Sequence, residues 1–244
     1  HLEHLNAQQA QRVEFAPRAP GKIRVGYFSA DYFHHATTHL MMELLDSHDR
    51  GRFEIHAFSL GPQRYDAARE QVVQSVDGFH DISSMTDQEA AALSRSLNID
   101  IAVDLKGFTK DGRLGLFAER CAPIQVSYLG YPGTTGADYM DYVIADEIVI
   151  PLDKQRFFTE KPVYMPHSYQ VNNSQRAISA RQFTRTELGL PENAFVFCCF
   201  NNNYKILPDT FDSWMRILQA VPGSVLWLFK DNEAAADNLS LIHI

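Results

Sequence analysis

From residue 22 onward, short apolar runs alternate with longer amphipathic segments along the chain. Short apolar runs of about four to eight residues are typical of strands that are covered on both faces. The amphipathic segments space their apolar residues by three or four positions, as Leu40, Met41, Leu44 and Leu45 do, which predicts helices. The predicted strands are 23–29, 53–60, 99–107, 124–130 and 142–150, and the predicted helices are 37–48, 65–77, 86–97 and 112–121. Helices placed between buried strands imply a parallel, doubly wound α/β sheet.

The regular alternation weakens between residues 151 and 185, where Pro, Asn, Gln and Arg are frequent. This composition suits a connection between two domains. Beyond it, the pattern predicts a helix and turn over 182–193 and a strand over 194–201, followed by an amphipathic helix over 208–222 and a strand over 224–230. These elements resemble the opening of a second Rossmann-like unit, which usually has about five or six strands.

The two ends of the chain differ from the rest. Residues 1–14 are polar and helix-prone, and the sequence APRAPGK that follows indicates a linker. The last six residues, LSLIHI, resemble translated adapter sequence, which suggests a truncated reading frame. We therefore expect a helical tail and linker at 1–21, an N-terminal Rossmann-like catalytic domain at 22–170, and the beginning of a C-terminal domain at 171–244.

Composition narrows the range of functions. The chain has 244 residues, 45% of them hydrophobic, and a formal net charge of −8. Such an acidic chain is a poor ligand for nucleic acid or for an anionic membrane, and no apolar run approaches the roughly 18 residues of a membrane span. Cys121, Cys198 and Cys199 form no CxxC pair, and the last two should point to opposite faces of a strand. They favour buried free thiols in a reducing cytoplasm.

Three histidines stand in the stretch SADYFHHATTHLM at 29–41, directly after the first predicted strand. His35 and His39 are four residues apart and share a face on a helix. The spacing is that of a zinc metalloprotease, but the glutamate that such an enzyme needs after the first histidine is missing, so a metal site is disfavoured. A neutral histidine that orients or deprotonates a hydroxyl remains open, as does a histidine with a purely structural role.

Three more segments follow predicted strands, where ligands bind in open α/β sheets. DLKGFTKDGR at 104–113 carries Lys106, Lys110 and Arg113, which suit either an anion or solvent. LGYPGTTGA at 129–137 is a glycine-rich loop whose amides can approach a phosphate or a sugar, unless it is a simple turn. FNNNYKILPDTF at 200–211 brings a lysine and several asparagines to a helix start marked by Pro208, which favours an anion or is an ordinary loop.

Three of these motifs, in this order, resemble the O-linked N-acetylglucosamine transferase family. They are GYFSADYFHHATTHLM at 26–41, CAPIQVSYLGYPGTTG at 121–136 and FNNNYKILP at 200–208, and the resemblance covers roughly residues 23–230. It implies a GT-B-type α/β fold, with a complete N-terminal Rossmann-like domain and the beginning of a second one, and tetratricopeptide repeats upstream. The implied reaction is inverting transfer of GlcNAc from UDP-GlcNAc to Ser or Thr hydroxyls of proteins, without a metal or other cofactor.

Residue by residue, the resemblance implies that His35 is the active-site histidine, acting as a base or as a positioner. Lys205 would contact the donor diphosphate and count as catalytic. Asn202 stands where animal enzymes carry glutamine, so its donor contact is implied only by position. The residues implied in nucleotide-sugar binding are Leu129, Gly130 and Pro132, which border the donor sugar, and Asn202, Tyr204 and Lys205.

Other functions remain as alternatives. One alternative is a SPINDLY-type protein O-fucosyltransferase, which uses GDP-fucose. The motifs of such enzymes resemble GYPNTTG and NNLAKI, whereas this chain has GYPGTTG and NNNYKI, so transfer of GlcNAc is favoured over transfer of fucose. Relatives that use UDP-glucose, a non-catalytic repeat-protein scaffold, and a metal-dependent hydrolase based on His35 and His39 are further alternatives. Because the family's later motifs are missing, we expect residues 1–244 alone neither to bind UDP tightly nor to transfer sugar.

Overall fold

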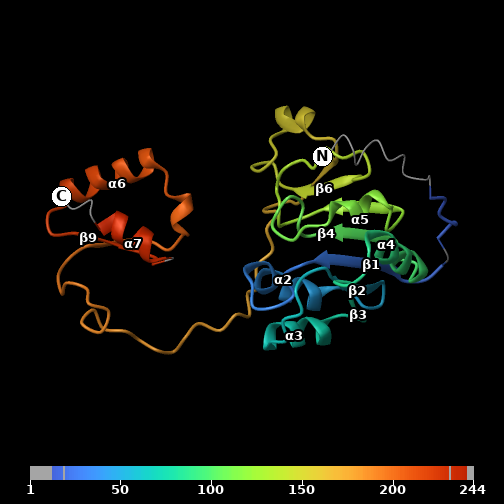
Figure 1. Cartoon of the computed structure of the whole chain (residues 1–244), viewed down its shortest axis with the longest axis horizontal. Helices are drawn as coiled ribbons and strands as arrows, with labels where there is room; N and C mark the ends of the chain where they lie inside the picture. The colour runs from blue at the N-terminus through green and yellow to red at the C-terminus, as the bar shows by residue number, and fades with distance from the viewer. Residues whose placement is uncertain (1–12, 19, 231, 241–244) are drawn as a thin grey trace. The chain divides into compact units, whose positions relative to one another are not determined.

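The computed structural model describes residues 13–18, 20–230 and 232–240. It separates the chain into two compact units, the first up to Arg176 and the second from Ala177 (Figure 1). Each unit is described by itself. Most of the predicted helical tail lies outside the described residues.

A seven-stranded parallel sheet forms the centre of the first unit. Its order is β3-β2-β1-β4-β5-β6-β7, and every pairing between neighbouring strands is parallel. This order extends the strand order of a dinucleotide-binding fold by one edge strand. The strands are β1 (Ile23–Ser29), β2 (Phe53–Ser59), β3 (Gly78–Asp81), β4 (Ile101–Asp104), β5 (Ile124–Ser127), β6 (Tyr142–Ala145) and β7 (Lys161–Tyr164). The parallel α/β architecture expected from the sequence is therefore confirmed.

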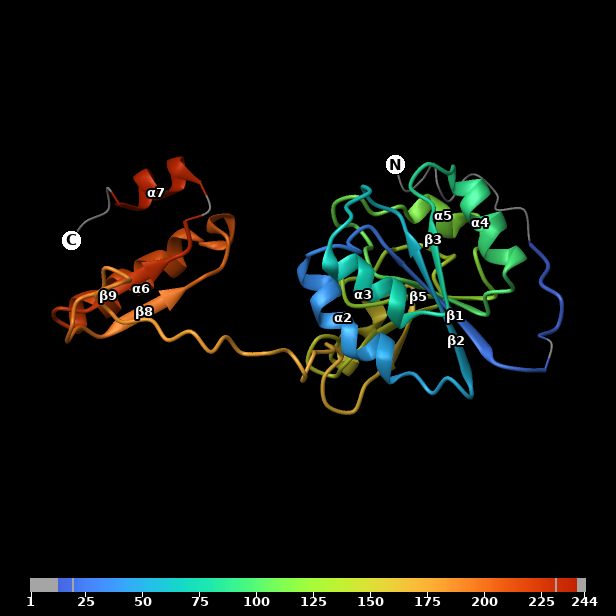
Figure 2. The same cartoon turned by 90° about the horizontal axis from the view of Figure 1, so that it is seen from below.

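Helices cover both faces of this sheet (Figure 2). One face carries α2 (Ala36–Ser47) and α3 (Ala67–Ser75), and the other carries α4 (Asp87–Ser96) and α5 (Leu114–Ala118). A short 3₁₀ helix, η1 (Leu152–Phe157), precedes β7. A capping box begins α4, because Thr86 and Glu89 exchange side-chain to backbone hydrogen bonds.

The core forms two layers because successive residues of a strand point to opposite faces. Val25 and Tyr27 of β1 pack into the cluster that contains Met41 of α2. Phe28 points the other way and stacks on Phe58 of β2, with ring centroids 4.3 Å apart. Both faces of the central strands are thus buried, which explains why apolar residues occur at both odd and even positions of these strands.

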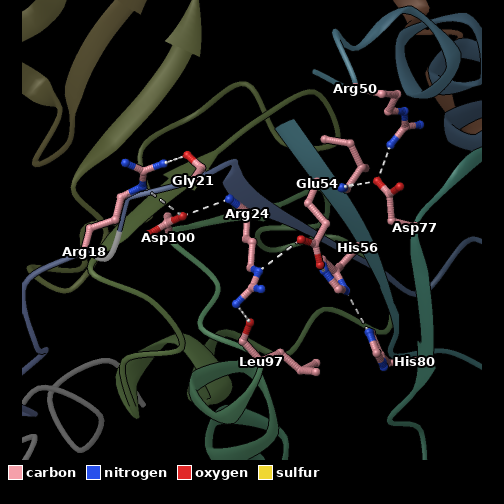
Figure 3. A network of polar contacts seen from close by, with 11 residues as sticks. Arg18, Gly21, Arg24, Arg50, Glu54, His56, Asp77, His80, Leu97 and Asp100 are labelled. Carbon is pink, nitrogen blue, oxygen red and sulfur yellow. Dashed lines mark hydrogen bonds and ion pairs between the residues drawn. The ribbon is translucent and has the colours of Figure 1, made fainter. Parts of the chain in front are cut away.

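Polar contacts join the linker to the amino-terminal edge of this sheet (Figure 3). The Arg18 guanidinium lies 3.4 Å from the carboxylate of Asp100, which also accepts the backbone N–H of Arg24 at 2.8 Å. The Arg24 side chain in turn donates to Glu54 at 3.2 Å. The linker residues therefore extend along the edge opposite to the carboxyl ends of the strands.

Several predicted boundaries in the first unit are wrong. Strands β3 and β7 were not predicted: β3 is short and contains His80 and Asp81, and β7 contains Pro162. Proline is tolerated in β7 because this strand lies at the edge of the sheet. The strand predicted over 142–150 ends at Ala145, because the carboxylate of Asp146 accepts the backbone N–H groups of Ile148 and Val149 and turns the chain.

The second unit contains a two-stranded parallel sheet, β8-β9. Its elements are β8 (Val196–Cys199), the 3₁₀ helix η2 (Asn203–Lys205), α6 (Pro208–Ala220), β9 (Val225–Leu228) and α7 (Glu233–Ser240), the last of which was not predicted. Of the helix and turn predicted over 182–193, the turn is present and the helix is wrong: Thr184 and Glu187 form a cap, but Gly189 adopts a φ of 67° and ends a single turn. No described side chain of this unit is fully buried.

The three cysteines differ in their exposure. Cys121 is a buried free thiol, as expected, but Cys198 is exposed, and Cys199 is half-buried. The two neighbours lie on opposite faces of β8, so only one face of this strand is shielded. Among the helices that the structure describes, none is long and apolar enough to cross a membrane.

Candidate functional site

The strand order of the first unit reverses direction between β1 and β4. The chain leaving β1 enters α2 on one face of the sheet, and the chain leaving β4 enters α5 on the other face. The two loops therefore diverge above the carboxyl ends of these strands. In open α/β sheets this switch point is where ligands bind.

Asp31 and Lys106 form an ion pair at the switch point. The Lys106 Nζ donates to Asp31 Oδ2 at 2.7 Å, and the two side chains are only 6% and 9% exposed. Asp31 follows β1 and Lys106 follows β4, so the contact joins the two loops that diverge there. Removing each ion from water costs several kcal/mol, and only a well-formed pair offsets this cost. Each of the two side chains therefore depends on the position of the other.

His35 lies beside this ion pair. It is the N-cap residue of α2, and its Nδ1 accepts the backbone N–H of Thr37 at 3.2 Å. The same Nδ1 is 3.5 Å from Asp31 Oδ2, and the side chain is 41% exposed. Because Nδ1 accepts the Thr37 hydrogen bond, the neutral ring carries its proton on Nε2. The other ring nitrogen, Nε2, is then a hydrogen-bond donor.

Asp104 shapes the loop that holds Lys106. One carboxylate oxygen accepts the backbone N–H of Lys106 at 2.9 Å, and the other accepts that of Gly107 at 2.9 Å. The side chain is buried, and burial raises the pKa of Asp104 to about 6 despite these hydrogen bonds. The carboxylate thus holds the turn after β4 in the conformation that points Lys106 at Asp31.

The glycine-rich loop after β5 adjoins the same edge of the sheet. Leu129 is buried and has a φ of 64°, an uncommon conformation for a non-glycine residue. A Cβ at Gly130 would lie 1.9 Å from the carbonyl oxygen of Leu105, so only glycine fits against the end of β4. Pro132 follows and is exposed. The structure therefore brings Leu129 and Gly130 next to the loop that carries Lys106.

The remaining predicted site residues lie in the second unit, between β8 and α6. Asn202 immediately precedes η2, and its carbonyl oxygen accepts the backbone N–H of Lys205 at 3.0 Å. The Lys205 Nζ lies 5.9 Å from the centroid of the Tyr204 ring, and both side chains are exposed. No side chain caps the start of α6, so its first amides are not satisfied by a cap. A lysine and free helix amides thus share one loop, as the sequence indicated.

Other candidates from the sequence are accounted for separately. His39 does not join His35; its Nε2 lies 2.9 Å from Nδ1 of His34. Arg113 donates to Asp87 at 2.6 Å and to backbone carbonyls, so it does not join Lys106 in an anion site. Within the described residues, no group of three or more His, Cys, Asp or Glu side chains is arranged to hold a metal ion.

Sequence reasoning missed Asp31 as the partner of Lys106 and missed Glu160 as the residue that binds the glycine-rich loop. Asp31 could have been found from its place two residues after a strand, at the same sheet edge as Lys106. Glu160 gave no such signal, because it precedes an edge strand that was not predicted.

Comparison with known proteins decides the family. A model of Glycosyl transferase family 41 matches residues 2–182 and 176–242. The chain belongs to this family. The resemblance found from the three motifs is therefore confirmed for a family 41 catalytic region.

Relatives of this family 41 chain occur in plants and animals. It is 38% identical over 214 residues to the probable UDP-N-acetylglucosamine--peptide N-acetylglucosaminyltransferase SEC of Arabidopsis thaliana, covering 86% of this chain and 22% of the relative. It is 34% identical over 207 residues to the probable UDP-N-acetylglucosamine--peptide N-acetylglucosaminyltransferase SPINDLY of Oryza sativa subsp. japonica, covering 83% of this chain and 22% of the relative. The chain thus spans about a fifth of the length of these two relatives.

A solved structure is similar to the family 41 chain as well. It is a lysine-to-methionine mutant of Thermobaculum terrenum O-GlcNAc transferase, with 29% sequence identity and a TM-score of 0.79. The match covers 90% of this chain and 41% of that chain. The expected GT-B-type α/β fold class is confirmed, with a seven-stranded parallel sheet in the first unit and a small parallel sheet in the second.

Proposed function

We propose that the protein of which this family 41 chain is a part transfers GlcNAc from UDP-GlcNAc to Ser or Thr hydroxyls of acceptor proteins, with inversion at the anomeric carbon. The observation that carries this proposal is the polar cluster of His35, Asp31 and Lys106 at the switch point of the sheet. The motif resemblance and the activities for which the relatives are named support the donor and the acceptor class. Inversion and the choice of Ser or Thr hydroxyls follow from the resemblance alone.

Lys205 is proposed to stabilise the leaving diphosphate. Negative charge grows on UDP as the bond to the sugar breaks, and a cation beside helix amides stabilises that charge. Lys205 lies three residues before Pro208, at which the 13-residue helix α6 begins. Asn202 and Tyr204, from the same loop, are proposed to contact the donor. A lysine in this role supplies a positive charge at the phosphates.

His35 is proposed to position a reacting group rather than to take a proton directly. Its Nδ1 is occupied by the Thr37 amide at 3.2 Å, so the neutral ring offers Nε2–H to an acceptor oxygen. The same Nδ1 faces the cluster, 3.5 Å from the Asp31 carboxylate, which leaves Nε2 on the other side of the ring. Leu129, Gly130 and Pro132 are proposed to border the sugar, because their loop adjoins the same sheet edge.

A donor assay with the complete protein tests this proposal. Hydrolysis and transfer are measured with UDP-GlcNAc, UDP-glucose and GDP-fucose at equal concentrations. We expect release of UDP from UDP-GlcNAc to be the fastest by about tenfold or more, since a missing hydrogen-bonded substituent leaves polar groups of the site unpaired. Faster turnover of GDP-fucose or UDP-glucose would replace the proposed donor, and no turnover of any donor would favour a non-catalytic scaffold.

A further inference from the structure

Glu160 is a buried carboxylate outside the cluster already described. It is 2% exposed and directly precedes β7. Within the described part of the chain, no ion pair joins it to a lysine, arginine or histidine. A buried charge without a cation is unfavourable unless hydrogen bonds replace its hydration. The partners of Glu160 therefore explain why it is there.

The glycine-rich loop supplies most of these partners. Glu160 Oε1 accepts the backbone N–H of Thr135 at 2.7 Å and also the Thr135 hydroxyl. Glu160 Oε2 accepts the Thr134 hydroxyl at 2.7 Å and that of Thr159 at 3.1 Å. Burial raises the pKa of Glu160, but the hydrogen bonds from Thr135 and Thr134 outweigh it and hold the pKa below its ordinary value. The carboxylate thus stays ionised while it binds four donors.

The other end of this loop is fixed by backbone contact. Gly130 lies against the carbonyl oxygen of Leu105 at the end of β4. The ring of Tyr131 packs edge-on against Phe108, with centroids 5.5 Å apart. The exposed Pro132 lies between this contact and the threonines that Glu160 holds. The Pro132 ring restricts its φ. The loop is therefore held at both ends and has a stiff residue at its exposed position.

We propose that Glu160 is a positioning residue for the donor: it fixes the loop of residues 129–136 so that the loop presents a preformed edge to the sugar. This inference rests on the proposed function, because it takes the loop to border the donor. A loop held in place before binding does not have to be ordered by the ligand, which lowers the cost of binding. A displacement of about 1 Å at such a position costs up to about 10²-fold in rate.

Two pairs of variants in the complete protein test this clamp, by which we mean the hydrogen bonds from Thr134 and Thr135 to Glu160. In Glu160→Gln, the amide NH₂ replaces an acceptor oxygen and faces one of the loop donors. Thr135→Val removes only the hydroxyl, whereas Thr135→Ser keeps both donors. Glu147→Gln is the control, because Glu147 is exposed on the turn after β6. We expect the KM for the sugar donor to rise about tenfold in Glu160→Gln and Thr135→Val, while their KM for the acceptor protein stays unchanged. In Thr135→Ser and Glu147→Gln, both KM values should equal those of the wild type.

A second readout does not depend on activity. Hydrogen exchange of residues 129–136 should accelerate at least about tenfold in Glu160→Gln, while exchange in β1 and β4 stays unchanged. Unchanged exchange in the loop would overturn the clamp even in an active enzyme. Fast exchange in the loop together with an unchanged donor KM would overturn its role in donor positioning. A wild-type protein that turns over no donor contradicts the proposed function, whereas the exchange experiment still decides the clamp.

Discussion

The ammonium group of Lys106 lies 2.7 Å from the carboxylate of Asp31, which is 75 residues earlier in the chain. The pair joins the loops that follow β1 and β4 at the point where the strand order reverses. The imidazole of His35 adjoins the same carboxylate at 3.5 Å. One buried charge pair therefore holds together the two sides of the switch point and the candidate active-site histidine.

Breaking this pair should destabilise the protein strongly. Lys106→Met leaves Asp31 buried without a partner, which costs about 3–5 kcal/mol. Adding Asp31→Asn removes the orphaned charge, so the double variant should recover a large part of that loss. Scanning calorimetry of the complete protein measures both, with Lys110→Met, at an exposed position, as the control. A double variant as unstable as Lys106→Met would show that the pair does not act as a unit.

His35 combines a structural role with the proposed chemical one, and one substitution separates them. Asparagine is among the best N-cap residues, so His35→Asn keeps a cap on α2 but withdraws the ring and its Nε2–H. We expect unchanged thermal stability and a fall in kcat of about 10²-fold, because the reacting group loses its positioning contact. Steady-state kinetics of the complete protein, with His34→Asn as control, measure this. If only KM rose, His35 would bind a substrate without taking part in the chemical step.

Lys205 is expected to be essential for transfer. Lys205→Ala in the complete protein removes the positive charge at the start of α6, and the rate should fall by about 10²-fold or more because the leaving charge loses its stabilisation. Lys154→Ala changes another exposed lysine, in the first unit, and serves as the control. Turnover of Lys205→Ala near the wild-type rate would remove this residue from the mechanism.

Acid should destabilise the first unit through a histidine pair (Figure 3). His56 lies 3.0 Å from Glu54 through Nε2 and 3.0 Å from His80 through Nδ1. Burial and the neighbouring His56 lower the pKa of His80. The unfolded chain therefore takes up a proton near pH 6.5 before the folded chain does, so stability falls as the pH drops below about 6.5.

A substitution at the same position tests this pH dependence. Glutamine donates a hydrogen bond without titrating, so the thermal midpoint of His80→Gln should fall less between about pH 7.5 and 5.5 than that of the wild type. Some loss should remain, because burial also lowers the pKa of His48. An identical pH dependence in both proteins would show that the pair is not responsible.

The positions of the central strands were predictable because their two buried faces leave short, mostly apolar segments in the sequence. It predicted β3 and β7 poorly because an edge strand is held by backbone pairing with one neighbour, and His80 or Pro162 is compatible with that. The helix expected over 182–193 failed for a local reason, since Gly189 ends the turn.

The positions of the candidate site residues along the chain were predictable where those residues stand in sequence motifs. His35, Gly130 and Lys205 each follow a strand, and each stands in a segment with a chemical reason to be there. The contacts of Asp31 with Lys106 and of Glu160 with Thr135 were not predictable, because they join residues that are 75 and 25 positions apart. Such contacts follow from the strand order, which a local pattern does not contain.

The most direct test of the proposed function is the site of modification on an acceptor protein. The complete protein, wild type and Lys205→Ala, is incubated with UDP-GlcNAc and an acceptor, and the acceptor is mapped by tandem mass spectrometry. We predict GlcNAc on serine and threonine hydroxyls with the wild type and about 10²-fold less with Lys205→Ala. Unmodified acceptor with the wild type, or equal modification by both proteins, would contradict the proposed function and its mechanism.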